Sequence, residues 1–511
     1  MNTKIRQKIV RCKQRIERRL DKQDIRGCDK PIMTATNIHY EIDERTRVTA
    51  QGGIGMIHRM VKKLGLDQAI NNNLPLLKLK RPYHESDHVL NIAYNMLAGG
   101  KCLEHLELRR TDEPYLDALG ARRIPDPTTA GDFCRRFGIS HIVWLQEIIN
   151  SIRLKVWQQQ PESFFDKAVI EADGTMVETT GQCKQGMEIN YKGQWGYHPL
   201  VVSLANTSEP LFVANRSGNR PSHEHAFYYF DKAIALCRQA GFKKIHLRGD
   251  TDFTQTEHLD RWNGQKITFV FGIDAMDRLY EIAGELPLEA WKTLERREKY
   301  TVKTQRRGQR ENVKQQVVED RKFEDIRLVK EHVAEFPYQP TKCKETYRVV
   351  VVWKDLHVYR GQKFLFDKEK CFFYITNDKS MTAEEIVFDA NARCNQENLH
   401  AQLKGDVRSL TAPLDNLVSN WAYMVMSSLA WSLKAWAALL LPENGRWKDR
   451  HRTEKQKLLR MDFSTFRAAM MQIPTQIVTT GRRIVCRLLG WNPWQHVFFR
   501  LLDQLARPLR C

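Results

Sequence analysis

Between residues 168 and 271 the chain alternates short β-rich runs with helical patterns, and this alternation constrains the fold more than any other feature. Three strand-like runs come first, followed by a helical pattern, a strand, a short helix and a last strand. The strand-like runs lie at 168–173, 198–204, 211–214, 244–250 and 267–271. Strands interleaved with helices in this way predict an α/β layer with a mixed sheet.

Two of these runs end in a carboxylate, at Asp173 and at Asp250. Ligands of open α/β sheets gather at the carboxyl ends of the strands, and Mg²⁺ is a hard cation that prefers oxygen ligands. Two Asp residues from neighbouring strands, together with a Glu from a helix, can hold two metal ions roughly 3.5–4 Å apart, as phosphodiester chemistry requires. Many α/β proteins also carry Asp at strand ends, so a purely structural role is the alternative for each residue.

A helix from Thr382 to Lys404 is predicted to supply the third carboxylate. Thr382 and Glu385 form the pattern of a capping box, and Gly405 provides the stop. Four residues are predicted to lie on one face of this helix: Arg393, Glu397, His400 and Lys404. A face with one carboxylate and several cations can bind a metal and a phosphate together. The alternative is a solvated face with an i, i+4 ion pair, and for His400 a packing role.

The segment from about 276 to 380 interrupts the α/β pattern. Tyr347–Trp353 and Cys371–Thr376 read as strands within it. Asp250 and Glu397 are 147 residues apart, far more than one strand-to-helix connection needs. We therefore predict a β-rich insertion between them.

The charge balance points to a polyanionic partner. The chain contains 81 Lys and Arg against 61 Asp and Glu, a net charge of +20, with a pI near 9.4. At this size such an excess favours nucleic acid as the partner, the alternative being a basic surface that serves solubility. A basic amphipathic helix is predicted within the first 22 residues, and residues 53 to 138 read as mainly helical.

Several other classes are disfavoured. The 11 cysteines include no Cys-x-x-Cys pair, which argues against a zinc ribbon and a disulfide scaffold. The N-terminal residues lack the apolar core of a secretory signal. The apolar run Trp421–Leu441 is interrupted by Lys434 and serines, so it is predicted to be a buried core helix and not a membrane span. A cytoplasmic protein without membrane contact is expected.

The residues at these positions resemble bacterial insertion-sequence transposases of the DDE class. Arg393, Glu397 and Lys404 have the spacing of the Glu-bearing signature, while Arg248–Phe253 and Glu171–Thr175 resemble the motifs around the two Asp. More narrowly, three strings resemble the insertion sequence thirteen-eighty family: Glu85–Asn95, Ile124–Phe133 and Tyr191–Pro199. The resemblance spans about residues 50 to 440. One departure is Ala390, where the wider signature has Tyr.

The resemblance implies an RNase H-like catalytic core, a mixed sheet with flanking helices, interrupted by the β-rich insertion. It implies Asp173, Asp250 and Glu397 as ligands of two Mg²⁺ ions, with Mn²⁺ able to substitute; Asp252 is the rival of Asp250. Arg393, Lys404 and His400 are expected to bind DNA phosphates. The implied partners are double-stranded DNA, as terminal inverted repeats and target, and a second copy in a homodimer. The expected activity is strand cleavage followed by strand transfer, in the bacterial cytoplasm at the nucleoid.

Six segments are therefore predicted for the 511 residues. They are a basic N-terminal arm (1–50), a helical DNA-binding domain (51–160), the first part of the core (161–275), the insertion (276–380), the second part of the core (381–441) and a basic helical C-terminal region (442–511). Two alternatives remain open: an RNase H-like DNA nuclease without strand transfer, and a catalytically silent DNA-binding regulator.

Overall fold

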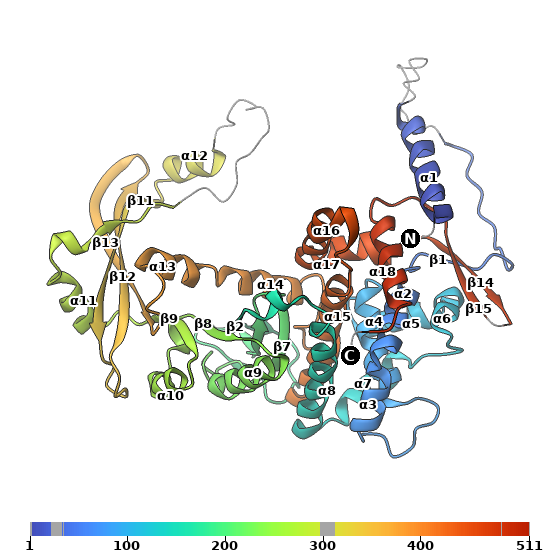
Figure 1. The fold of residues 1–511 in the computed structure, drawn as a ribbon, viewed down its shortest axis with the longest axis horizontal. Helices are drawn as coiled ribbons and strands as arrows, with labels where there is room; N and C mark the ends of the chain where they lie inside the picture. Colours follow the sequence, from blue (N-terminus) through green and yellow to red (C-terminus); the bar gives the residue numbers. More distant parts are fainter. Residues whose placement is uncertain (1–2, 22–32, 34, 297–311, 482, 510–511) are drawn as a thin grey trace. The chain divides into compact units, whose positions relative to one another are not determined.

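The computed structural model describes residues 3–21, 33, 35–296, 312–481 and 483–509 (Figure 1). The chain forms two compact units. The first unit combines residues 1–164, 175–220 and 398–511, and the second combines residues 165–174 and 221–397. Each unit is thus assembled from separated stretches of sequence. The six predicted segments stay a prediction.

The first unit is mainly helical. Its helices are α1 Thr3–Asp21, α2 Ile54–Leu64, α3 Leu66–Asn73, α4 Glu85–Leu97, α5 Leu106–Arg110, α6 Glu113–Leu119, α7 Pro127–Arg135, α8 Ile139–Trp157, α15 Leu417–Leu439, α16 Lys448–Arg460, α17 Phe463–Phe466 and α18 Gln495–Leu505. The longest, α15, packs against α4, α8 and α16. Every residue from Ser419 to Leu439 is buried, which confirms the predicted core helix. No helix in the described part of the chain is long and apolar enough to cross a membrane.

Short strands complete the first unit. They are β1 Val48–Thr49, β3 Val177–Glu178, β4 Glu188–Ile189, β5 Trp195–Tyr197, β6 Leu200–Leu204, β7 Glu209–Ala214, β14 Thr475–Thr480 and β15 Arg483–Leu488. The strands β14 and β15 form an antiparallel hairpin with β1 on its edge, so the C-terminal region predicted to be helical contains two strands beside its helices. The β-branched residues of these two strands favour extended backbone, and the helical prediction overlooked them.

A buried acid holds the core of the first unit together. The Glu209 carboxylate, at the start of β7, accepts hydrogen bonds from Arg153 Nε at 3.0 Å, Trp157 Nε1 at 3.0 Å and Trp436 Nε1 at 2.9 Å. The side chains of Arg153 and Glu209 are 1% and 0% exposed. Three helix-borne donors therefore converge on one charge that cannot reach water.

Glu454 on α16 gives this unit a pH-dependent contact. It pairs with Arg500 of α18 at 2.6 Å and with His496 at 2.8 Å. Burial opposes its ionisation, but hydrogen bonds from His496, Arg500 and Arg450 outweigh burial and lower the pKa of Glu454 to about 2.

We expect the docking of α18 on α16 to weaken as the pH falls from about 4.5 towards 2. A carboxyl group with a lowered pKa in the folded state contributes stability above its unfolded pKa, and that contribution, about 2–3 kcal/mol here, is lost on protonation. Thermal unfolding curves between pH 2 and 5 measure the effect, which should be absent from Glu454→Gln. An equal acid sensitivity in the variant would contradict the assignment.

The second unit is built on a mixed sheet. Its strands are β2 Lys167–Gly174, β8 Lys244–Gly249, β9 Thr268–Ile273, β10 Lys292–Thr293, β11 Glu324–Tyr338, β12 Tyr347–Arg360 and β13 Lys363–Thr376. Within this unit they lie in the order β10-β11-β12-β13-β9-β8-β2. The pairs β2–β8 and β8–β9 are parallel. The pairs β9–β13, β13–β12, β12–β11 and β11–β10 are antiparallel. The predicted insertion is β-rich, and its strands extend the sheet of the core.

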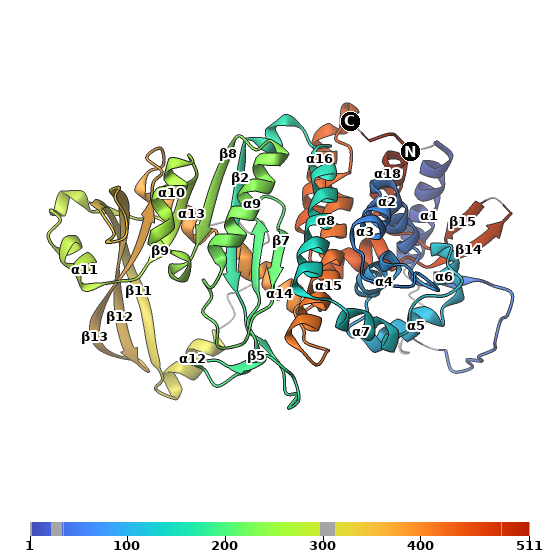
Figure 2. The ribbon, with the colours of Figure 1, turned by 90° about the horizontal axis from the view of Figure 1, so that it is seen from below.

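Helices cover both faces of this sheet. The helices of this unit are α9 Ala226–Ala240, α10 Leu259–Gly264, α11 Asp277–Gly284, α12 Val313–Asp320 and α13 Ala383–Asn391. Figure 1 shows α9 and α10 on one face of strands β2, β8 and β9, with α13 on the other, and Figure 2 shows the long strands β11 to β13 from below. The apolar core beneath α13 consists of Val270, Leu294, Val333, Val350, Val352, Ile386, Val387 and Ala390. Thr382 and Glu385 form the predicted capping box at the start of α13.

Candidate functional site

Two parallel strands bring Asp173 and Asp250 to the same edge of the sheet. In the register of β2 and β8, Glu171 lies opposite Arg248. An aspartate follows each of them two residues later: Asp173 lies near the end of β2, and Asp250 comes directly after β8. The predicted meeting of the two strand ends is therefore present.

Arg393 does not lie inside a helix. The predicted helix 382–404 is interrupted: α13 ends at Asn391, and α14 begins at Cys394 and ends at Lys404. Arg393 occupies the turn between them, where the N–H of Gln396 donates to its carbonyl at 2.8 Å. Asn and Cys are weak helix formers, so Asn391, Cys394 and Asn395 permit this break. The prediction that Arg393 lies on the same helix as Glu397 was wrong.

The guanidinium of Arg393 contacts three carboxylates. Its Nη1 lies 3.5 Å from Asp173 Oδ2 and 3.3 Å from Asp250 Oδ2, and its Nη2 lies 3.9 Å from Glu397 Oε1. The acids come from β2, from the loop after β8 and from the first turn of α14. Residues separated by more than two hundred positions thus converge around one positive charge.

The ionised forms of Asp173 and Asp250 are disfavoured in this group of carboxylates. Burial, and then the neighbouring charge of Asp250, raise the pKa of Asp173 to about 7, although Arg393 acts in the opposite direction. Burial also raises the pKa of Asp250. Acids that resist ionisation in a group of this kind often mark a functional site, because a bound cation is what stabilises their charged form.

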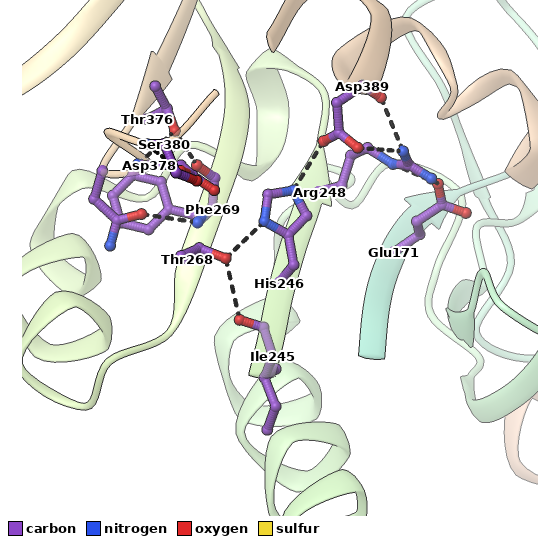
Figure 3. A network of polar contacts seen from close by, with 11 residues as sticks. Glu171, Ile245, His246, Arg248, Thr268, Phe269, Thr376, Asp378, Ser380 and Asp389 are labelled. Atoms are coloured by element: carbon purple, nitrogen blue, oxygen red, sulfur yellow. Dashed lines mark hydrogen bonds and ion pairs between the residues drawn. The ribbon is translucent and has the colours of Figure 1, made fainter. Parts of the chain in front are cut away.

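A second layer of charged residues, which contains Glu171, Arg248 and Asp389, was not predicted from the sequence (Figure 3). Arg248 donates to Glu171 at 2.7 Å through Nε and to Asp389 Oδ1 at 3.1 Å through Nη1. His246 Nε2 lies 2.8 Å from the other oxygen of Asp389 and Nδ1 lies 2.8 Å from Thr268. Burial opposes the ionisation of Asp389, but its hydrogen bond with His246 and the nearby cations lower its pKa.

The sequence carried a signal for this layer. Alternate residues of a strand point to the same face, so Glu171 and Arg248 belong to the same side of the sheet as Asp173 and Asp250. An acid and a base two residues before the two aspartates indicate a buried pair that fixes the spacing of β2 and β8. Asp389, four residues before Arg393, adds α13 to the same ionic group.

A cavity of about 380 Å³ adjoins the carboxylates in the second unit. Asp250 and Arg393 line it together with Lys370 and Tyr374 of β13. Asp252, the rival of Asp250, is exposed in the 3₁₀ turn Thr251–Phe253, and its N–H donates to Asp250 Oδ1 at 3.2 Å. Of these two aspartates, it is Asp250 whose carboxylate lies 3.3 Å from the Arg393 guanidinium.

His400 and Lys404 lie further along α14, in the part that belongs to the first unit. His400 is 7% exposed, which fits the packing role considered as its alternative, and Lys404 is partly exposed. Their assignment to DNA phosphates stays a prediction.

The chemistry of the donor set suits a divalent metal. Carboxylate oxygens from three elements are the ligands that Mg²⁺ prefers, and the guanidinium of Arg393 acts as a stand-in cation among them. Within the described ranges, no three His, Cys, Asp or Glu side chains are grouped closely enough to hold a metal as they stand. The acids are arranged around Arg393, so a metal requires this guanidinium to move.

The similarity of this chain to known proteins identifies its family. It is similar to a piggyBac transposase whose structure was determined by cryo-EM as a synaptic complex with hairpin DNA, with 10% identity, a TM-score of 0.35 and coverage of 91% of this chain and 86% of that chain. No curated protein sequence matches. The model of the family described as transposase DDE domain group 1 matches residues 31–509. This match covers nearly the whole chain, and the chain therefore belongs to the DDE transposase family.

Proposed function

We propose that this transposase binds the terminal inverted repeats of an insertion sequence, cleaves DNA there and transfers the freed strand to target DNA. The observation that carries the proposal is the convergence of Asp173, Asp250 and Glu397 on one cation at the strand ends. Cleavage frees a 3′-hydroxyl, which then attacks a phosphodiester of the target. The sequence motifs support a place in the insertion sequence thirteen-eighty family.

We also propose that the core is RNase H-like. The order of elements supports this: β2, the antiparallel hairpin β6–β7, α9, β8, α10 and β9, with β2, β8 and β9 parallel in register. The insertion then follows β9, and α13 and α14 return the chain to the acidic site.

Asp173, Asp250 and Glu397 are the residues that would hold the metal, two Mg²⁺ ions or Mn²⁺ in their place. The bound metal supplies activation of a nucleophilic oxygen and neutralisation of charge on the scissile phosphate. Asp173 must lose its proton to serve as a ligand, so metal uptake should release protons near neutral pH. Arg393 and Lys404, with His400 as a further candidate, hold phosphate oxygens through charged hydrogen bonds.

The DNA partners are double-stranded terminal repeats and target DNA, and a homodimer would hold two DNA ends together. A bacterial cytoplasmic location at the nucleoid follows from the insertion-sequence proposal. The net charge of +20 supports a polyanionic partner. Exposed basic residues of α1 contribute to this charge, among them Arg11, Arg15, Arg18 and Arg19.

A gel assay with a labelled terminal-repeat duplex, target DNA and Mg²⁺ tests the proposal. Cleaved and joined products are expected, and EDTA should abolish both. Cleavage without joining would support a nuclease, and a shifted band without either product would support a DNA-binding regulator. Either result would contradict the proposed transposition.

DNA affinity should fall steeply with salt. If the basic surface binds phosphates, each contact releases condensed counterions, and six to ten contacts reduce affinity by about 10³–10⁵ between 50 and 200 mM salt. Fluorescence anisotropy of a labelled duplex over this range measures the slope. A flat response would remove the electrostatic argument for DNA binding.

A further inference from the structure

The two layers of charge, the first around Arg393 and the second around Arg248, differ in how closely their cation is held. In the second layer the cation is Arg248, whose Nε and Nη1 lie 2.7 Å from Glu171 and 3.1 Å from Asp389. In the first layer the cation is Arg393, which lies 3.3–3.9 Å from its three carboxylates. The side chain of Arg248 is 6% exposed and that of Arg393 is 24% exposed. The cation of the second layer is fixed, whereas that of the first layer is loosely held.

The surroundings of Arg393 allow it to leave. It stands in the turn between α13 and α14, so its backbone is not constrained by a continuous helix. It also lines the cavity of about 380 Å³ beside Asp250, which gives the guanidinium room to swing away from the acids. Lys370 lines the same cavity and makes it attractive to a phosphate.

We propose that Arg393 is a resident counter-ion of the metal site: it neutralises Asp173, Asp250 and Glu397 before a divalent metal binds, and the metal displaces it. This inference rests on the proposed metal-dependent function. The displaced guanidinium becomes available to a DNA phosphate at the same site. Metal binding and phosphate binding are thereby linked through one side chain.

The physical reason is competition for the same charge. The guanidinium lies against the carboxylate oxygens that a metal needs as ligands, and its charge repels an incoming divalent ion at these distances. The measured affinity for a metal is then the intrinsic affinity reduced by the fraction of molecules in which the guanidinium has moved away. Removing the guanidinium removes this competition.

The first experiment measures Mn²⁺ binding by isothermal titration calorimetry to the full chain and to Arg393→Gln. We expect the variant to bind Mn²⁺ about tenfold or more tightly, because no resident cation must be displaced. Arg278→Gln is the matched control, since Arg278 is an exposed cation of the same unit and its ion pair with Glu281 lies at the surface. Equal or weaker binding by Arg393→Gln would overturn the inference.

A second experiment uses the unaltered protein and so does not depend on the folding of a variant. Phenylglyoxal modifies exposed arginines, and mass spectrometry of the digested protein reports each site. We expect Ca²⁺ to increase the modification rate of Arg393 severalfold while that of the buried Arg248 stays low. An unchanged rate at Arg393 in saturating Ca²⁺ would overturn the inference.

Asp173→Asn separates a failure of this inference from a failure of the proposed function. If Mn²⁺ binding is lost in Asp173→Asn but is no tighter in Arg393→Gln, only the counter-ion role is wrong. If neither the unaltered chain nor Arg393→Gln shows Mn²⁺ binding that depends on Asp173, the metal-dependent function and the counter-ion role are both wrong.

Discussion

Asp173→Ala is expected to abolish DNA cleavage while DNA binding is retained. Asp173 is the most buried of the three carboxylates around Arg393. Its replacement removes a proposed metal ligand and should weaken the stabilisation of the charge that develops in the transition state. A reduction of the cleavage rate by about a thousandfold or more follows. Binding should persist, because the net charge of the surface rises slightly. Cleavage on a gel and anisotropy of the same labelled duplex measure the two properties.

Asp252→Ala is the matched control for the second ligand. Asp252 is exposed beside Asp250, so its replacement should leave cleavage near the level of the unaltered protein, whereas Asp250→Ala should abolish it. Retention of cleavage by Asp173→Ala would contradict the site. Loss of cleavage in Asp252→Ala with retention in Asp250→Ala would transfer the second role to Asp252.

Glu209→Gln should produce the largest loss of stability in the first unit. The substitution preserves the shape of the side chain but removes the carboxylate charge that pairs with the Arg153 guanidinium, which is 1% exposed. Breaking a buried ion pair from one side costs about 3–5 kcal/mol, which corresponds to a fall of roughly 4–7 °C in the unfolding midpoint of a unit of this length. Differential scanning calorimetry of the full chain measures the change.

Two comparisons make this expectation specific. Glu281→Gln removes a surface ion pair of the second unit and should change the midpoint by less than about 1 °C. Adding Arg153→Met to Glu209→Gln should recover part of the loss, because both charges of this buried pair are then removed. A change in Glu209→Gln no larger than in Glu281→Gln would contradict the role of this acid.

The sequence predicted the parts of the site that depend on local pattern. Asp173 and Asp250 follow β-rich runs, and parallel strands place their carboxyl ends at one edge, so their meeting was predictable. The capping box at Thr382 and the buried helix α15 were also predictable, because the pattern of neighbouring residues indicates both. Their signals lie within one turn of a helix or one strand.

Features that depend on tertiary contacts were not predicted. The break at Arg393 has only weak helix formers as its local signal, and the ring of carboxylates around that residue is a long-range effect. The strand β11 was missed because its outer half, from Glu324 to Lys330, is largely exposed and its apolar residues alternate only at Ile326 and Leu328. Glu209 could not be identified as buried, since its partners Arg153, Trp157 and Trp436 come from distant helices.

The central claim is that Asp173, Asp250 and Glu397 bind the divalent metal that DNA cleavage requires. Anomalous diffraction from crystals of the full chain grown with terminal-repeat DNA and Mn²⁺ tests it most directly. We predict manganese peaks about 2.1 Å from carboxylate oxygens of these three residues, at the spacing expected for hard-cation ligation. Manganese bound elsewhere, with the three acids still closed around Arg393, would contradict the claim.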